Sequence, residues 1–140
     1  MESISKTLCG ADSVTLAEAA VAVLIEKKAL DVRLYEVGEE NPVTDYYVNV
    51  TGRSLTQVAA LADEVVFKLS EQGKEALRTE GKRGNAWILV DYGDVIVNVF
   101  DKESREFYNL DRLMPADSEK DISGIVARVD AKLKINSKEE

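Results

Sequence analysis

The stretch Ala86–Leu113, AWILVDYGDVIVNVFDKESREFYNLDRL, decides the fold of this 140-residue chain. Two apolar runs in it flank the pair Tyr92-Gly93, which predicts a tight β-hairpin. We expect these two residues to form the loop, so that Asp91 lies opposite Asp94. The same register continues away from the turn in two further pairs: Leu89 with Ile96, and Trp87 with Asn98.

Side chains alternate along a strand, so this hairpin has two different faces. One face is apolar throughout, and we expect it to be core: Ala86, Ile88, Val90, Val95, Val97 and Val99. The other face is half polar and carries an indole, two carboxylates and a carboxamide, with Phe100 at its far end. This second face is either a binding surface or an ordinary solvated sheet face.

The same segment resembles the signature of the ribosomal silencing factor family, also called Iojap-like. That pattern runs Trp, three apolar residues, Asp-Tyr-Gly, an apolar strand ending in His-apolar-Phe, an Arg, a Tyr-x-Leu-acid run and an aromatic. The matching positions are Trp87, Asp91, Tyr92, Gly93, Phe100, Arg105, Tyr108, Leu110 and Asp111. There are two departures, since Asn98 stands where the family usually has His and Met114 where it usually has an aromatic residue.

The upstream stretch DYYVNVTGRSLTQVAALADEV, Asp45–Val65, resembles the family's strand, Thr-Gly-x-Ser turn and Gln-bearing helix. The resemblance covers residues 14–114 and implies an α/β fold, a mixed β-sheet flanked by helices with nucleotidyltransferase-like topology. The order of elements independently favours a mixed sheet, because strands alternate with helices early and an antiparallel hairpin follows.

The resemblance also implies a function. A family member would bind a large-subunit ribosomal protein at the subunit-joining face, block association with the small subunit and repress translation when nutrients are scarce. The mechanism would be binding rather than catalysis, without a cofactor or metal. We expect the partner-binding residues on the hairpin face and just after it: Trp87, Asp91, Tyr92, Asn98, Phe100, Arg105 and Tyr108. Family members tend to be homodimers when free, and an edge strand with exposed apolar groups would permit pairing.

The net charge of −8 argues against a direct grip on nucleic acid, which needs a surplus of Lys and Arg on one face. It suits a basic protein partner. Cys9 is the single cysteine and the chain has no His, which excludes an internal disulfide, a Cys–His nucleophile pair and His-ligated metal sites. No apolar run approaches the ~20 residues of a membrane span, and we expect a cytoplasmic protein.

The pattern of the remaining chain predicts one domain, 14–133, between a flexible leader, 1–13, and a flexible tail, 134–140. The first part of it predicts a helix with a Thr15–Glu18 capping box, strands at Asp31–Val37 and Tyr46–Thr51, and a helix from Ser54 to about Gly73. The later part predicts a short helical stretch plus loop at Gly73–Asn85, a short strand at Glu106–Leu110, and a last helix capped by Ser118 or Asp121.

A rival interpretation is a metal-dependent nucleotidyltransferase-like enzyme. Gly52 and Ser54 imitate the Gly-Ser pair at a helix start, but no strand reads Asp-x-Asp or Asp-x-Glu. The same turn is either an anion site or simply a capped helix entry, and its glycine pattern lacks the phosphate-binding fingerprints. Arg105 either forms a surface ion pair with Glu103 or Asp101 or supports the hairpin face.

Overall fold

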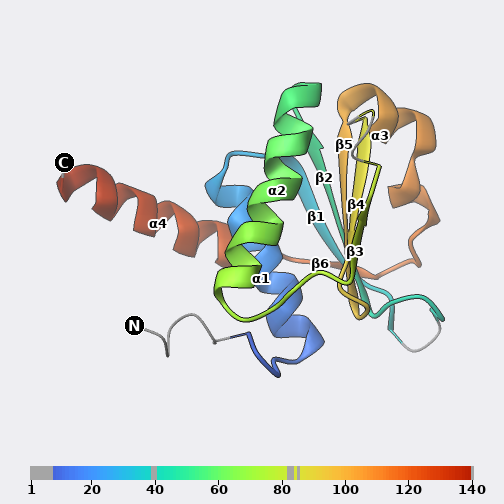
Figure 1. The fold of residues 1–140 in the computed structure, drawn as a ribbon, viewed down its shortest axis with the longest axis horizontal. Helices are drawn as coiled ribbons and strands as arrows, with labels where there is room; N and C mark the ends of the chain where they lie inside the picture. The colour runs from blue at the N-terminus through green and yellow to red at the C-terminus, as the bar shows by residue number, and fades with distance from the viewer. Residues whose placement is uncertain (1–7, 39–40, 82–83, 85, 140) are drawn as a thin grey trace.

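The computed structural model describes residues 8–38, 41–81, 84 and 86–139. Within these residues, six strands form one sheet in the order β3-β4-β5-β2-β1-β6 (Figure 1). The strands are β1 (Leu30–Glu36), β2 (Tyr46–Gly52), β3 (Arg78–Glu80), β4 (Trp87–Asp91), β5 (Val95–Asp101) and β6 (Glu119–Lys120). The central pair β2 and β5 is parallel and the other neighbours are antiparallel. The predicted mixed α/β fold is therefore confirmed.

The helices are α1 (Ser13–Glu26), α2 (Leu55–Glu71), α3 (Lys102–Tyr108) and α4 (Ser123–Glu139), and a 3-10 turn, η3, spans Leu110–Leu113. Helices α1 and α2 cover one face of the sheet, whereas α3 lies on the opposite side (Figure 1). We call that opposite side the α3 face. Among the described residues, no helix combines the length and the apolar character that crossing a membrane requires.

The apolar face of the hairpin is core, as predicted, and lies under α1 and α2, although Ala86 at its end is only half-buried. Its valines and isoleucine are fully buried: Ile88, Val90, Val95, Val97 and Val99. They pack with apolar stripes from both helices, including Leu16, Leu24, Leu61 and Leu69. Burial of such side chains is the main source of stability in a domain of this size.

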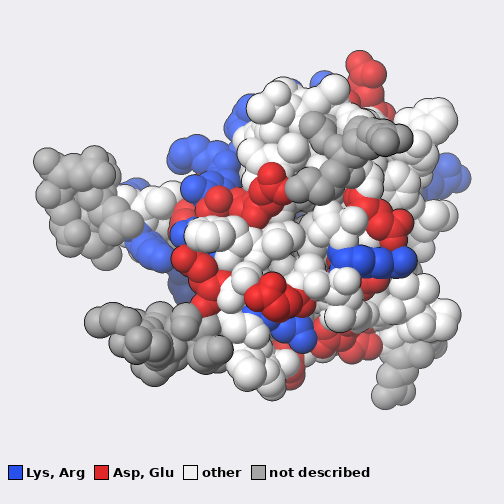
Figure 2. Space-filling view, viewed as in Figure 1, with Lys and Arg blue, Asp and Glu red and all other residues white. Residues whose placement is uncertain are grey.

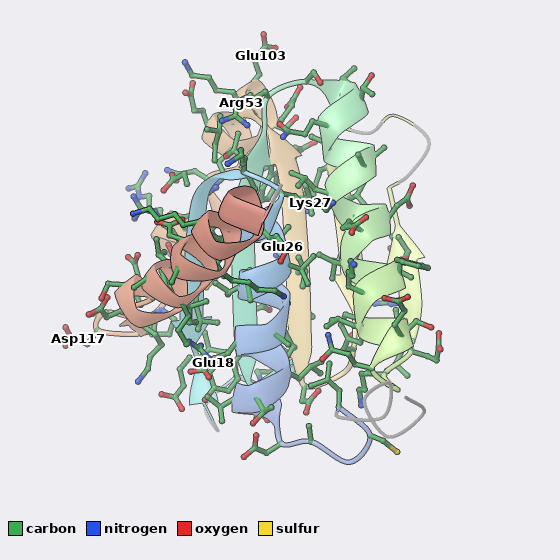
Figure 3. The ribbon with its side chains drawn as sticks, turned by 90° about the vertical axis from the view of Figure 1, so that its left-hand side faces the viewer. Glu18, Glu26, Lys27, Arg53, Glu103 and Asp117 are labelled. Carbon is green, nitrogen blue, oxygen red and sulfur yellow. The ribbon has the colours of Figure 1, made fainter. Side chains whose placement is uncertain are left out.

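Helix α4 lies across α1 and extends away from the rest of the domain (Figures 1 and 3). Lys132 Nζ of α4 lies 3.8 Å from Glu26 Oε2 of α1, and Lys27 Nζ lies 3.5 Å from Glu64 Oε2 of α2. These pairs are solvent-exposed or partly so, and they contribute little free energy. The contact between α4 and the domain depends instead on buried Ile125 and Val129.

The register of the hairpin differs from the prediction by two residues. Trp87 pairs with Phe100, Leu89 with Asn98, and Asp91 with Ile96. The turn is closed by the Tyr92 N–H, which donates to the Val95 carbonyl at 2.9 Å, so the loop is Gly93-Asp94 and not Tyr92-Gly93. Gly93 has a φ of 91°, which favours glycine at this position. A slip of two residues keeps every side chain on its face, so the predicted faces survive the wrong register.

Three helix starts differ in how well they were predicted. The Asp12 carboxylate caps α1 by accepting the Thr15 N–H at 3.0 Å, so the predicted Thr15–Glu18 capping box is wrong. For α2, Ser54 Oγ accepts the Gln57 N–H at 3.1 Å, as predicted. At the start of α4, Asp121 accepts the Ser123 N–H at 2.9 Å, whereas Ser118 is buried and donates to Pro115.

Two short elements were predicted wrongly. The segment Gly73–Asn85 contains strand β3, paired with β4, where we expected a helical stretch, and residues 82–83 and 85 of it lie outside the described ones. The segment Glu106–Leu110 lies in α3 and η3 and not in a strand. Helix α3 begins because the Asp101 carboxylate caps it, and it ends at Asn109 in the left-handed conformation.

The predicted leader and the predicted tail are only partly among the described residues. Residues 1–7 of the leader and residue 140 of the tail lie outside them. Leu8 of the leader is buried in the core, and its N–H donates to the Gln72 carbonyl at 2.8 Å. Helix α4 continues to Glu139.

Candidate functional site

A line of hydrogen bonds crosses the α3 face from β4 to β1. Trp87 Nε1 donates to Asn98 Oδ1 at 3.0 Å, and Asn98 Nδ2 donates to Asn49 Oδ1 at 3.1 Å. Asn49 Nδ2 donates to Asp111 Oδ1 at 3.2 Å, and Tyr35 Oη donates to the same oxygen at 2.7 Å. We call these five residues the polar chain. They connect four neighbouring strands to the 3-10 turn η3.

Arg105 of α3 joins the polar chain at Asp111. Its Nε lies 2.8 Å from Asp111 Oδ2 and its Nη2 lies 3.2 Å from Asp111 Oδ1, a two-pronged contact. Its Nη1 donates to Thr51 Oγ1 and to the Asp31 carbonyl, each at 2.9 Å. The arginine is only 7% exposed. It therefore fastens α3 and η3 to strands β1 and β2.

The predicted surface ion pair of Arg105 with Glu103 or Asp101 is wrong. Asp101 instead accepts the Ser104 N–H at 2.8 Å and caps α3. The spacing along the chain suggested these neighbours, but α3 turns the arginine inward, toward the sheet. The alternative expectation was that Arg105 supports the hairpin face. The observed geometry agrees with it, because Arg105 anchors α3 and η3, which lie on that face.

The environment of Asp111 keeps it ionised at neutral pH. Burial alone would raise the pKa of this carboxyl, but hydrogen bonds from Arg105, Tyr35 and Asn49 outweigh it, and the net pKa is lowered. Burial, together with the hydrogen bond to Asp111, raises the pKa of the Tyr35 phenol. The buried guanidinium therefore faces a carboxylate, which a buried cation requires.

Aromatic rings pack together beside the polar chain. The indole of Trp87 lies between Phe100, at a centroid distance of 5.1 Å, and Tyr108, at 4.7 Å. Phe107 meets Tyr108 edge to face at 5.0 Å. Phe100 is fully buried, whereas exposure increases outward, to 47% for Tyr108 and 81% for Phe107.

Helix α3 and the turn η3 thus present large apolar side chains to solvent. They are Phe107, Tyr108 and Leu113, the last 74% exposed. We call these three residues the α3 surface. Exposed aromatic side chains on a rigid support are typical of protein interfaces rather than of solvated surfaces.

The predicted site residues divide into buried and accessible ones. Asn98, Phe100 and Arg105 are buried on the α3 face, and Tyr92 is buried in the core on the other face. These four side chains are enclosed by the protein itself, and their predicted role in partner binding stays a prediction. The accessible ones are half-buried Trp87 and Asp91, together with exposed Tyr108.

Several residues of the site were not among those predicted: Tyr35, Asn49, Thr51, Phe107, Asp111 and Leu113. Two signals were available: Asp111 is a position of the family signature, and Asn49 is a polar residue in the middle of the apolar strand YYVNVTG. A polar side chain in such a strand indicates a buried hydrogen bond or a face that is not core. Its partner Asn98 lies directly beside it in the parallel β2–β5 pair.

The two carboxylates at the hairpin turn do not form a pair. Asp91 accepts Arg78 Nε at 3.1 Å and the Gly93 N–H at 2.7 Å, and its cross-strand neighbour is Ile96 and not Asp94. Within the described part of the chain, no group of three or more His, Cys, Asp or Glu side chains is placed to hold a metal ion.

The Gly52-Arg53-Ser54 turn has the contacts of a helix entry. Arg53 Nη1 donates to the Lys28 carbonyl at 2.6 Å, beyond the end of α1. A Cβ on Gly52 would lie 2.8 Å from the Val58 side chain, so a glycine is needed where β2 approaches α2. These contacts favour the capped-helix interpretation over an anion site.

Acidic and basic side chains are interspersed on the face seen in Figure 2. Figure 3 shows Glu18 and Glu26 on the helix side of the molecule, with Lys27 and Arg53 toward one end. The charge is thus distributed widely, with a net value of −8 for the chain.

Comparison with known proteins gives the same family as the sequence motif. The family model described as "Ribosomal silencing factor during starvation" matches residues 11–140. The chain is 34% identical over 112 residues to ribosomal silencing factor RsfS of Halalkalibacterium halodurans, covering 80% of this chain and 96% of that protein. It is 37% identical over 94 residues to the Bacillus subtilis protein of the same name, covering 67% and 80%.

A solved structure agrees as well. A crystal structure of a protein from Chromobacterium violaceum superposes with a TM-score of 0.71 at 30% identity, covering 74% of this chain and 86% of that one. The resemblance seen in the sequence is thereby confirmed, and this chain belongs to the ribosomal silencing factor family.

Proposed function

We propose that this protein binds the large ribosomal subunit through a basic ribosomal protein at the subunit interface and sterically prevents the small subunit from joining. Translation is repressed by occupancy and not by catalysis, and no cofactor takes part. Family membership supports the ribosome as the target. The single structural observation that supports this contact site is the α3 surface, with its exposed apolar side chains.

The α3 surface suits a protein partner because it is both apolar and rigidly held. The Tyr108 ring packs at a tilt against Trp87, which in turn packs at a tilt against buried Phe100. Arg105 anchors the same helix to the sheet. Aromatic side chains with little freedom to lose are the residues that most often dominate binding energy.

The net charge of −8 supports a basic partner and not a nucleic acid. Opposite charge on a ribosomal protein would speed encounter, while direct binding to phosphates would be opposed. We also propose that the protein acts in the cytoplasm.

We further propose that the free protein is a homodimer. The edge strand β3 supports this, since exposed Leu77 lies directly before it and its outer side has no strand partner among the described residues. An open edge of this kind can pair with a second copy.

A subunit-joining assay tests the proposal. Purified large and small subunits are mixed with the full-length protein, and the monosome peak is measured in a sucrose gradient. We expect the peak to decrease with increasing protein. Joining that is unchanged at saturating protein would show the proposal to be wrong. Variants of the α3 surface, such as Tyr108→Ala, should be less effective in this assay. Phe67→Ala is their matched control, because Phe67 is an exposed aromatic residue of α2, away from the α3 face.

A further inference from the structure

The hydrogen bonds of the polar chain have a direction that chemistry imposes. The indole N–H of Trp87 only donates, and the carboxylate of Asp111 only accepts. Asn98 must therefore present its oxygen to Trp87 and its amino group to Asn49. Asn49 must likewise present its oxygen to Asn98 and its amino group to Asp111.

Each amide in this line has one permitted orientation. A flip of Asn98 would place its amino group against the indole N–H and its oxygen against the oxygen of Asn49. A flip of Asn49 would do the same at its two contacts. Both side chains are buried, at 0% and 1% exposure, so water does not compensate for the mismatch.

We propose that Asn49 and Asn98 are positioning residues. The fixed acceptor at Asp111 sets the orientation of Asn49, and Asn49 sets that of Asn98. The oxygen of Asn98 then faces the indole of Trp87 and holds that ring against Tyr108 at the α3 surface. Asp111 is itself fixed by Arg105 and Tyr35. We call the hydrogen bonds from Asp111 through Asn49 and Asn98 to Trp87 the relay. The link between the relay and partner binding rests on the proposed function, whereas the relay itself does not.

The geometry of the indole shows why such a relay is needed. Trp87 is only half-buried, so packing does not enclose it. Phe100 and Tyr108 contact the ring, but neither offers it a hydrogen-bond acceptor among the described contacts. Its Nε1 bond to Asn98 selects one rotation of the ring, and Tyr108 packs at a tilt against the ring in that rotation.

Trp87 is the only tryptophan of the chain and provides a spectroscopic probe of the relay. The full-length protein labelled with ¹⁵N shows one indole N–H resonance, and its shift and hydrogen-exchange rate report on the bond to Asn98. In the wild-type protein we expect exchange at least about tenfold slower than in a free indole. If the indole N–H of the wild-type protein exchanges as fast as that of a free indole, its bond to Asn98 does not protect it and the proposal is wrong.

Asn49→Leu tests the relay from a distance, because Asn49 bonds to Asn98 and Asp111 and not to Trp87. We expect a shifted indole resonance and exchange faster by about tenfold. Thr44→Val is the matched control, since Thr44 is a buried polar residue just before the same strand and donates to the Tyr46 carbonyl, away from Arg105 and the relay. An unchanged indole resonance in folded Asn49→Leu, or an equal shift in Thr44→Val, would contradict the proposal.

Co-sedimentation with large ribosomal subunits tests the consequence for binding. We expect Asn49→Leu to weaken association by about tenfold, and Thr44→Val to leave it unchanged. If Trp87→Ala weakens association and folded Asn49→Leu does not, the positioning role is wrong. If Trp87→Ala and Tyr108→Ala both bind normally, the proposed contact site is wrong, and the indole measurements still decide the relay.

Discussion

The guanidinium of Arg105 meets the carboxylate of Asp111 in a two-pronged contact, with Nε 2.8 Å from Oδ2 and Nη2 3.2 Å from Oδ1. Asp111 follows Arg105 by six positions in the sequence, and the left-handed Asn109 lies between them, where α3 ends and η3 begins. The pair therefore closes a compact loop over the sheet. It is also the place where the polar chain and the α3 surface meet.

Removing the carboxylate should destabilise the protein strongly. Asp111→Ala removes the closer of two carboxylates from the buried Arg105 and leaves only the exposed Asp31, whose Oδ2 lies 3.5 Å from Nη2. We expect a loss of about 3 kcal/mol in the free energy of unfolding. Urea denaturation at neutral pH measures it. Arg33→Met is the control, because the exposed Arg33–Asp31 pair should contribute less than about 1 kcal/mol. Equal losses in both variants would contradict a structural role for the buried pair.

The same carboxylate should make stability depend on acid pH. Its folded-state pKa is lowered from the ordinary value of 3.8, so its contribution is fully present above that value and is lost as pH falls through the lower folded-state pKa. The difference in stability between the wild-type protein and Asp111→Asn should therefore shrink as the pH falls below 3.8. Urea denaturation across this range measures the difference, and a constant difference would contradict the assigned charge state.

The hairpin shows which parts of the fold were predictable. The face that carries Ile88, Val90 and Val97 is apolar throughout and the intervening positions are half polar, which identified the core face, because face depends only on a period of two. The register was not predictable, since Tyr92-Gly93 and Gly93-Asp94 are both plausible turn pairs and a slip of two preserves both faces.

Strand β3 and helix α3 show where the sequence was silent or misleading. The residues of β3, Arg78–Glu80, carry no apolar alternation, and the strand forms by pairing with β4. Helix α3 has no long apolar stripe, and it is set by its Asp101 cap and by Arg105 pointing inward. Both depend on tertiary contacts that override weak local preference.

The candidate site was half predictable for a similar reason. Trp87 and Tyr108 were identified from one contiguous segment. Their support comes from Asn49 and Tyr35, which precede that segment by dozens of residues and reach it only through the strand order β4-β5-β2-β1. Which strands become neighbours is not visible in local patterning.

The α3 surface should carry ribosome association. Tyr108→Ala and Phe107→Ala each remove an exposed aromatic ring from α3, and we expect association with large subunits to weaken by about tenfold or more. Trp87→Ala should weaken it by about thirtyfold, since it also removes the ring beneath Tyr108. Co-sedimentation measures association, and circular dichroism confirms folding. Normal binding by all three variants, or an equal loss in Phe67→Ala, would place the contact elsewhere.

Two glycines should respond in opposite ways to alanine. A Cβ on Gly52 lies 2.8 Å from the Val58 side chain and 3.0 Å from its backbone nitrogen, so Gly52→Ala should cost about 1–3 kcal/mol of unfolding free energy. Gly124 lies in α4 with no atom within 4 Å of such a Cβ, so Gly124→Ala should be neutral or stabilising by up to about 1 kcal/mol. Thermal denaturation distinguishes them, and a tolerated Gly52→Ala would contradict the close packing of β2 against α2.

The enzyme alternative predicts that Mg²⁺ with a nucleoside triphosphate raises the melting temperature, since a ligand that binds only the native state stabilises it. We expect no such shift. Asp91 is engaged by Arg78 and by the Gly93 N–H, and its cross-strand neighbour is Ile96, so the two turn carboxylates do not form a paired metal site. Arg53, the cation next to the helix start, is bound to the Lys28 carbonyl. Differential scanning fluorimetry with and without Mg²⁺ and nucleotide makes the measurement. A reproducible metal-dependent increase that Asp91→Asn abolishes would favour catalysis over binding.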